Sequence, residues 1–100
     1  MVLLPRGRPA TQPDTKTYSG MVSARLRELR IDRGWSIQEV QARLLEVGVK
    51  ISLVGLYAWE RGSGANGSDV PTSVYPSIAR IYGYKTPAGW LPAEWPESDR

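Results

Sequence analysis

The sequence predicts an all-α fold, because apolar residues recur at helical spacing in several segments and these segments are bounded by Ser or Thr caps and by glycines. One hundred residues with 41% hydrophobic content are enough for one small domain with one modest core. Residues 19–91 are therefore expected to form a single helical domain, between an arm at 1–18 and a loose tail at 92–100.

The first helix is predicted to begin at Ser19 or Gly20 and to end at Arg33. Its apolar residues recur at intervals of four and three, which gives one buried side, and Gly34 follows as a helix stop. This buried side consists of Val22, Leu26 and Leu29.

The second helix has a complete start signal, in which Ser36 and Glu39 form a capping box. The helix is expected to run to about Leu45, and two interpretations of the next residues stay open. Either the helix continues to Val47, or the turn at 48–50 is a genuine loop, which is longer than the tight turn between paired helices. The core-facing residues are predicted to be Ile37, Val40 and Leu44.

The third helix lies within Ile51 to Gly62, with Ser52 as its N-cap and Gly62 as its stop. Leu56 and Trp59 are three residues apart, so they share one side of the helix and are assigned to the core. The other side is then formed by Leu53, Val54, Tyr57 and Ala58.

Residues 63–69 are rich in Gly and Ser and are predicted to form a mobile loop. Ser73 is expected to cap a fourth helix, with Pro76 at its third position and Gly83 at its end. Thr86 and the proline after it repeat this start for a short fifth helical turn that holds Trp90 and Leu91. The buried side of the fourth helix is predicted to be Val74, Ile78 and Ile81.

Composition narrows the function. The chain has no Cys and no His, which excludes disulfides, thiolate or imidazole zinc sites, Cys or His nucleophiles and the usual general base. The carboxylates show no paired acidic arrangement and no Gly-rich phosphate loop follows a strand, so no enzyme, metal or cofactor is expected. No apolar run is long enough for a membrane span or signal peptide, so a cytoplasmic protein is expected. Residues 1–35 contain seven Lys and Arg against three acidic residues, an excess that suits a surface facing phosphates.

The segment Trp59-Glu60-Arg61-Gly62, preceded by GWSIQEV and followed by PTSVYPSIARIYGY and GWL, resembles the phage-repressor helix-turn-helix family, of Cro and C1 type, also called XRE. The resemblance extends from Ser19 to Leu91. It implies a lambda-repressor-like bundle of about five short helices, whose third helix enters the major groove of DNA. It also implies a sequence-specific transcriptional regulator, repressor-like, that binds double-stranded DNA as a homodimer and is bacterial or phage-encoded and nucleoid-associated.

The resemblance assigns roles to particular residues. Arg30 and Glu60 match the buried ion pair of the family, the alternative being that both are solvated. The base-reading positions fall on residues that are not Arg, Asn or Gln, which leaves apolar contact with thymine methyl groups, and Gly55 is expected to let the helix backbone come close to DNA. The predicted contacts in this domain are Ser36, Ile37, Lys50, Ser52, Leu53, Val54, Gly55, Tyr57, Ala58 and Arg61.

The arm contains Pro5-Arg6-Gly7-Arg8-Pro9, which resembles the core of an AT-hook. In such a segment Arg6 and Arg8 lie in the narrow minor groove of A·T-rich DNA. A soluble Pro-rich tail is the alternative. A second function class also stays open, because the apolar third helix could bind a protein instead of DNA. The chain would then be a protein-interaction module, such as an antitoxin or adaptor, on the same scaffold.

Overall fold

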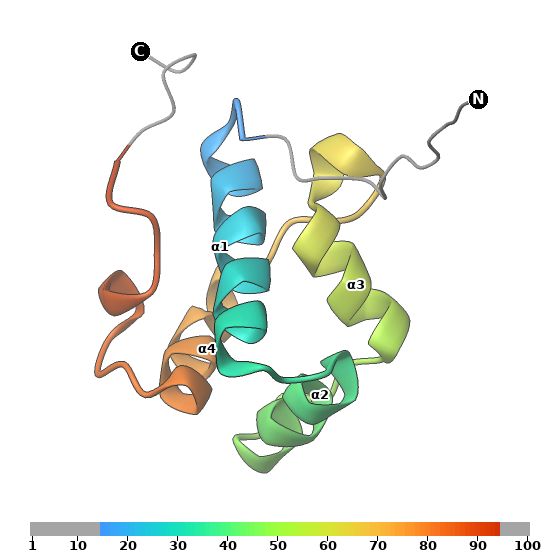
Figure 1. Cartoon of the computed structure of the whole chain (residues 1–100), viewed down its shortest axis with the longest axis vertical. Helices are drawn as coiled ribbons and strands as arrows, with labels where there is room; N and C mark the ends of the chain where they lie inside the picture. Colours follow the sequence, from blue (N-terminus) through green and yellow to red (C-terminus); the bar gives the residue numbers. More distant parts are fainter. Residues whose placement is uncertain (1–14, 95–100) are drawn as a thin grey trace, which may run out of the picture.

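The computed structural model describes residues 15–94, and within this range the chain is all-helical, without a strand (Figure 1). The predicted all-α class is therefore confirmed for the described range. The α-helices are α1 (Tyr18–Arg33), α2 (Ile37–Glu46), α3 (Leu53–Arg61) and α4 (Tyr75–Tyr82), and the 3₁₀ turns are η1 (Ser63–Ala65), η2 (Thr72–Val74) and η3 (Pro87–Gly89).

The expected number of about five helices is wrong, because the described chain has four α-helices. The segment predicted as a fifth helical turn is the 3₁₀ turn η3, in which Trp90 N–H donates to the carbonyl of Pro87 at 3.0 Å. Pro87 begins this turn and Pro92 follows shortly after it. Two prolines so close together leave no room for a run of α-helical hydrogen bonds.

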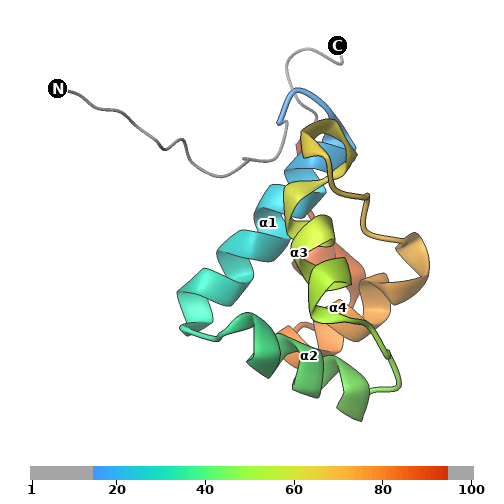
Figure 2. The same ribbon diagram turned by 90° about the vertical axis from the view of Figure 1, so that its right-hand side faces the viewer.

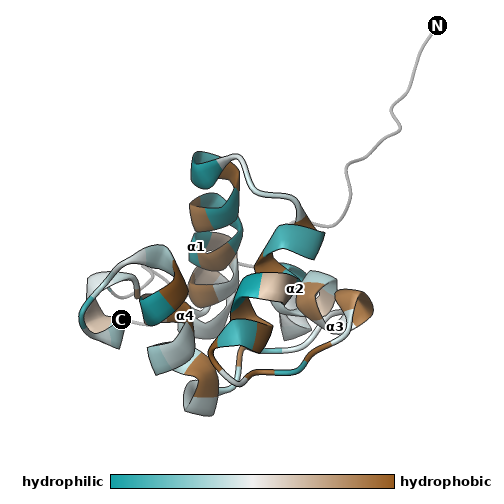
Figure 3. Cartoon of the chain, turned by 90° about the horizontal axis from the view of Figure 1, so that it is seen from below, coloured by the Kyte–Doolittle hydropathy of each residue, from teal (hydrophilic) through white to brown (hydrophobic). Residues whose placement is uncertain are grey.

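The helices pack in a chain of contacts: α1 on α3, α3 on α2, and α2 on α4 (Figures 1 and 2). Viewed from below, α1 and α2 carry both apolar and polar bands, as expected of helices with one buried side (Figure 3). The largest fully buried side chains come from all of these elements and from η3's neighbour Trp90. They are Trp90, Leu29, Leu44, Leu56, Ile78, Val22 and Val40.

Local capping residues fix the starts of α1 and α2. Thr17 caps α1 by accepting a hydrogen bond from Gly20 N–H at 3.1 Å, so α1 begins at Tyr18, inside the range predicted as arm. Ser36 caps α2 in the same way, accepting from Glu39 N–H at 3.1 Å. The Glu39 carboxylate forms an ion pair with Arg43, one helical turn later, at 3.0 Å. The Ser36 half of the predicted capping box is thus present, while the Glu39 side chain binds Arg43.

The connection between α2 and α3 combines the two alternatives left open. The helix continues to Glu46, one residue beyond Leu45, and a six-residue loop, 47–52, then leads to α3. Gly48 turns the chain with a φ of 91°, and Val49 N–H donates back to Leu44 at 2.9 Å. The loop is tied to α2 by Gln41, whose side-chain amide donates to the carbonyl of Ile51 at 2.9 Å.

The segment predicted as a mobile loop, 63–69, is instead folded against the end of α3. Gly67 N–H donates to Gly62 at 2.8 Å and Ser68 N–H donates to Ala58 at 3.0 Å. A Cβ on Gly67 would lie only 2.2 Å from the carbonyl oxygen of Ala58, so the glycine permits this close return of the chain. The Gly-rich composition therefore serves packing here.

The start of α4 also differs from the prediction. Ser73 lies in η2, and α4 begins at Tyr75 without a side-chain cap, which makes Pro76 its second residue. A missing N–H at this position breaks no helical hydrogen bond. The buried side is formed by Ile78, Ala79 and Tyr82, whereas the predicted Val74 and Ile81 are only partly buried.

Within residues 15–94, no helix is long and apolar enough to cross a membrane. The same range contains no cluster of three or more acidic, His or Cys side chains that could hold a metal ion.

Candidate nucleic-acid interface

Helix α3 is fixed to α1 by the Arg30–Glu60 ion pair. Arg30 donates two hydrogen bonds to the Glu60 carboxylate, Nε to Oε2 at 2.7 Å and Nη2 to Oε1 at 3.0 Å, and a third from Nη1 to the carbonyl of Trp35 at 3.2 Å. Glu60 is buried, with 6% of its surface exposed. The hydrogen bonds to Glu60 raise the pKa of Arg30, although burial opposes the rise. One guanidinium thus joins α1, the start of α2 and the end of α3.

A stack of aromatic rings and guanidinium groups connects the start of α2 with α4. The rings of Trp35 and Tyr82 are stacked, with centroids 5.0 Å apart, so the residue ahead of α2 packs on α4. The Arg43 guanidinium lies 4.0 Å from the Trp35 centroid, and that of Arg33 lies 5.6 Å from the Tyr82 centroid. The sequence gave no signal for this stack, because it depends on how α2 and α4 are placed.

The exposed side of α3 carries the residues that could meet a partner. Val54 is 76% exposed and Tyr57 is 47% exposed, and Arg61 follows one turn later. We refer to Val54, Tyr57 and Arg61 as the outer stripe. Lys50 is exposed just ahead of it, whereas Leu53 and Ala58 are only partly exposed at its edges. Leu53 packs against the core, which reduces the surface it offers to a base.

Some of the DNA contacts predicted at the helix starts involve groups that already have a role within the protein. The Ile37 side chain is buried, with 3% exposed, so it cannot meet DNA and only its backbone N–H remains for a phosphate. The Ser36 hydroxyl caps α2, and the Ser52 hydroxyl caps α3 by accepting from Gly55 N–H at 3.0 Å. Each hydroxyl is exposed and keeps its own hydrogen for donation to a phosphate.

Gly55 has a packing role that the sequence did not predict. A Cβ at Gly55 would lie 2.9 Å from Cγ1 of Ile51, so the missing side chain makes room for the protein's own residue below the helix. The glycine therefore permits packing of Ile51, and the approach of its backbone to DNA stays a prediction.

The remaining predicted contacts, Arg6 and Arg8, lie outside the described residues. Comparison with protein-family models, with curated proteins and with solved structures finds no match for the chain. The geometry alone thus defines the site: a short helix held on its inner side by an ion pair and core packing, with Val54 and Tyr57 exposed on its outer stripe.

Proposed function

We propose that the protein is a sequence-specific DNA-binding transcriptional regulator of the phage-repressor helix-turn-helix type, with a lambda-repressor-like arrangement of its helices. In this proposal α3 lies in the major groove and the N-terminus of α2 faces a phosphate. A homodimer would place two copies of α3 in successive major grooves, and occupancy of such a site would regulate transcription.

The observation that carries the proposal is the contrast between the two sides of α3. Its inner side is held by Leu56, Trp59 and Glu60, all buried, whereas Val54 and Tyr57 of the outer stripe are exposed and Arg61 is half-buried. A helix that enters a groove needs this combination, because its backbone must keep one orientation while its side chains reach the bases.

The outer stripe suggests how bases would be read. Val54 has no polar group, so it suits the thymine C5-methyl group, and the Tyr57 hydroxyl can bond a base edge or a phosphate. Lys50 and Arg61 lie at the two ends of the helix, where cations can meet phosphates on either side of the groove. Such a surface would recognise sequence mainly through methyl groups and shape.

The proposal is tested by selecting bound sequences from random DNA duplexes, together with a mass measurement of the complex in solution. We expect enrichment of a short site with thymine at defined positions and a complex containing two protein chains. Tyr57→Ala should abolish the enrichment. Ile31→Ala is the matched control, because Ile31 is a similarly exposed apolar residue on α1, with 55% exposed. Failure of the wild-type protein to enrich any sequence would contradict the proposal.

One observation favours a second candidate function. The most exposed residue of the outer stripe is apolar, and the first two turns of α3 carry no Arg, Asn or Gln for bidentate base contacts. An apolar helix surface of this kind can also bind a protein, as in an antitoxin or adaptor.

A further inference from the structure

Helix α1 meets the end of α3 at two points. Ser23 packs directly against Gly62, and about two turns further along α1 the Arg30 guanidinium holds Glu60. Arg27 lies between these points, four residues after Ser23 and three before Arg30, so it shares the side of α1 that faces α3. The residue of α3 between the two contacts is Arg61.

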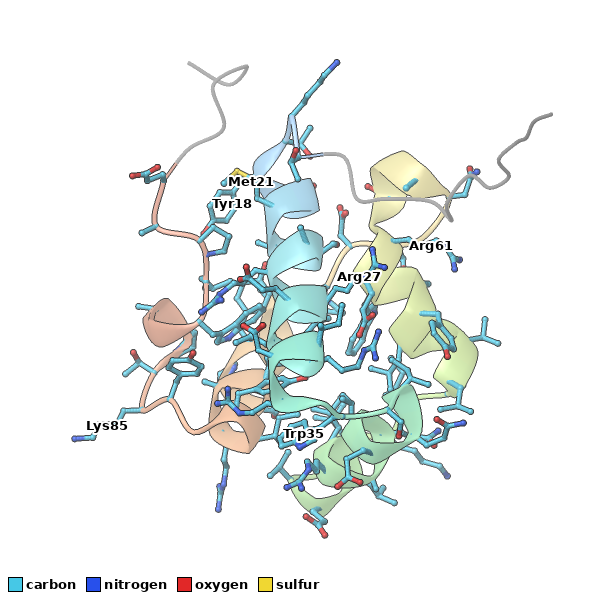
Figure 4. The ribbon with its side chains drawn as sticks, in the orientation of Figure 1. Tyr18, Met21, Arg27, Trp35, Arg61 and Lys85 are labelled. Carbon is cyan, nitrogen blue, oxygen red and sulfur yellow. The ribbon has the colours of Figure 1, made fainter. Side chains whose placement is uncertain are left out.

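Arg27 and Arg61 therefore lie on the two helices that border this seam. Figure 4 shows the Arg27 side chain reaching from α1 towards α3, on the side of α1 where Arg61 lies. Arg61 makes one long hydrogen bond, from Nη2 to the carbonyl of Asn66 at 3.4 Å. Neither guanidinium forms an ion pair with a carboxylate in the range 15–94.

The nearby carboxylates are already engaged. Glu60 is held by Arg30, Glu28 by Arg25, and Asp69 accepts hydrogen bonds from Ser63. An anion placed between two guanidinium groups is attracted by both of them.

We propose that Arg27 and Arg61 together bind one phosphate group of the DNA backbone. This inference rests on the proposed function and adds α1 to the DNA-binding surface. Guanidinium groups suit the task, because each presents a planar pair of N–H donors that matches two phosphate oxygens. Each of the two charged oxygens of a backbone phosphate can accept more than one hydrogen bond, so one phosphate can serve both guanidinium groups at once.

The phosphate site would also fix the depth at which α3 sits in the major groove. Arg27 belongs to α1 and Arg61 to the last turn of α3, so a phosphate held by both sets the position of the DNA strand relative to two helices. This constraint would act at the C-terminal end of α3, opposite the phosphate expected at the start of α2.

The experiment measures DNA binding by the full chain and by the variants Arg27→Gln, Arg61→Gln and the double variant. Arg80→Gln is the control, since Arg80 is an exposed arginine on α4. Each single change should weaken binding roughly tenfold, the effect of losing hydrogen bonds to a charged group. The double change should cost little more than either alone, and it should lower the slope of log affinity against log salt by about one.

A scan with single methylphosphonate substitutions then identifies the phosphate. Neutralising one particular phosphate should weaken binding of the wild-type protein and of Arg80→Gln, but should have no effect on either Arg27→Gln or Arg61→Gln. Arg27→Lys, which keeps the charge, should restore part of the affinity and shows that the loss is not one of folding.

The outcomes separate the two proposals. If the wild-type protein binds no duplex, the proposed function fails and the phosphate site fails with it. If the wild-type protein binds, but Arg27→Gln behaves like Arg80→Gln, the phosphate site is overturned while the function stands. Loss of sensitivity at two different phosphates in the two variants would also overturn it.

Discussion

Ser23 packs so closely against Gly62 that a Cβ on Gly62 would lie 2.9 Å from the Ser23 hydroxyl oxygen. Gly62 also has a φ of 82° and a ψ of 161°, a conformation that essentially only glycine adopts. Gly62→Ala should therefore lower the free energy of unfolding by about 3 kcal/mol, through both steric overlap and backbone strain. Denaturant unfolding measures this directly.

Two variants separate these causes. Gly34 has a φ of 70° but nothing within 4 Å of its Cβ position, so Gly34→Ala should cost only the strain, about 1 kcal/mol. Adding Ser23→Ala to Gly62→Ala removes the oxygen atom that overlaps and should recover part of the loss. Equal losses for Gly62→Ala and Gly34→Ala would show that the Ser23 contact does not limit the packing of α1 on α3.

The Arg30–Glu60 pair should behave as a coupled unit. Truncating either residue to Ala leaves a charge in a largely buried site, with a cost of about 3 kcal/mol, whereas Arg30→Met combined with Glu60→Leu should cost less. A double-mutant cycle on thermal unfolding should give a coupling energy above about 1 kcal/mol. A coupling below about 0.5 kcal/mol is typical of solvated pairs and would contradict a role in fixing α3.

Tyr82 should make the protein sensitive to alkali. Burial, and secondly the charge of Glu60, raise the pKa of Tyr82 above its ordinary value of 10.0, against the opposing effect of the arginines around it. Because its pKa is raised in the folded protein, Tyr82 loses its proton at a lower pH in the unfolded chain than in the folded one. The free energy of unfolding is therefore unaffected by this group below about pH 10 and falls as the pH rises further. Urea unfolding between pH 8 and 11 should show this fall.

Tyr82→Phe is the matched variant. Its alkaline loss of stability should be smaller than that of the wild type. At pH 7 it should be as stable as the wild type or more so, because the Tyr82 hydroxyl is buried without a hydrogen-bond partner among residues 15–94. A clear loss of stability at pH 7 would indicate that the hydroxyl does have a partner, such as a bound water.

Replacing thymine by uracil in a selected site tests the reading of methyl groups by α3. Affinity should fall by roughly 1 kcal/mol for each methyl in contact with the protein, the scale of burying one carbon and leaving a gap. Val54→Ser should lose the same discrimination, and the two losses should not add, since they remove the two sides of one contact. If uracil DNA binds equally well and Val54 is needed to hold a co-purifying protein, the protein-interaction function is favoured.

The Arg6 and Arg8 prediction is best tested by deleting residues 1–14. This deletion keeps Thr17, whose side chain caps α1, so the helical domain should retain its thermal stability. If the two arginines bind the minor groove, the deletion should lower DNA affinity and weaken any preference for A·T flanks. The slope of log affinity against log salt concentration should become shallower by up to about two. Unchanged affinity and salt dependence would leave the arm as a soluble tail.

The starts of α2 and α3 and the ends of α1 and α3 were predictable because their signals are local. Ser36 and Ser52 precede their helices directly, and Gly34 and Gly62 follow theirs, so a few neighbouring residues contain the information. The fold of 63–69 was missed, because the position of Gly67 depends on its contact with Ala58, and composition does not show such a contact.

The candidate site was predictable only in part for a related reason. Spacing assigned Val54 and Tyr57 to an exposed side, but it could not show that Gly55 makes room for Ile51. Arg30 and Glu60 were paired through a family resemblance, since thirty residues separate them. The placement of Arg27 and Arg61 along one seam depends on how α1 crosses α3, which no local pattern encodes.

The six-residue connection between α2 and α3 has a consequence for engineering. Because α3 is anchored to α1 through Arg30 and Glu60, its position does not depend on a tight turn. The space around Gly48 is open, with nothing within 4 Å of its Cβ position. A peptide tag or fluorophore-binding loop inserted at Gly48 should leave α3 in place, since doubling a loop costs only about 0.6 kcal/mol. The connection thus offers a point for attaching a probe close to α3 without altering the outer stripe.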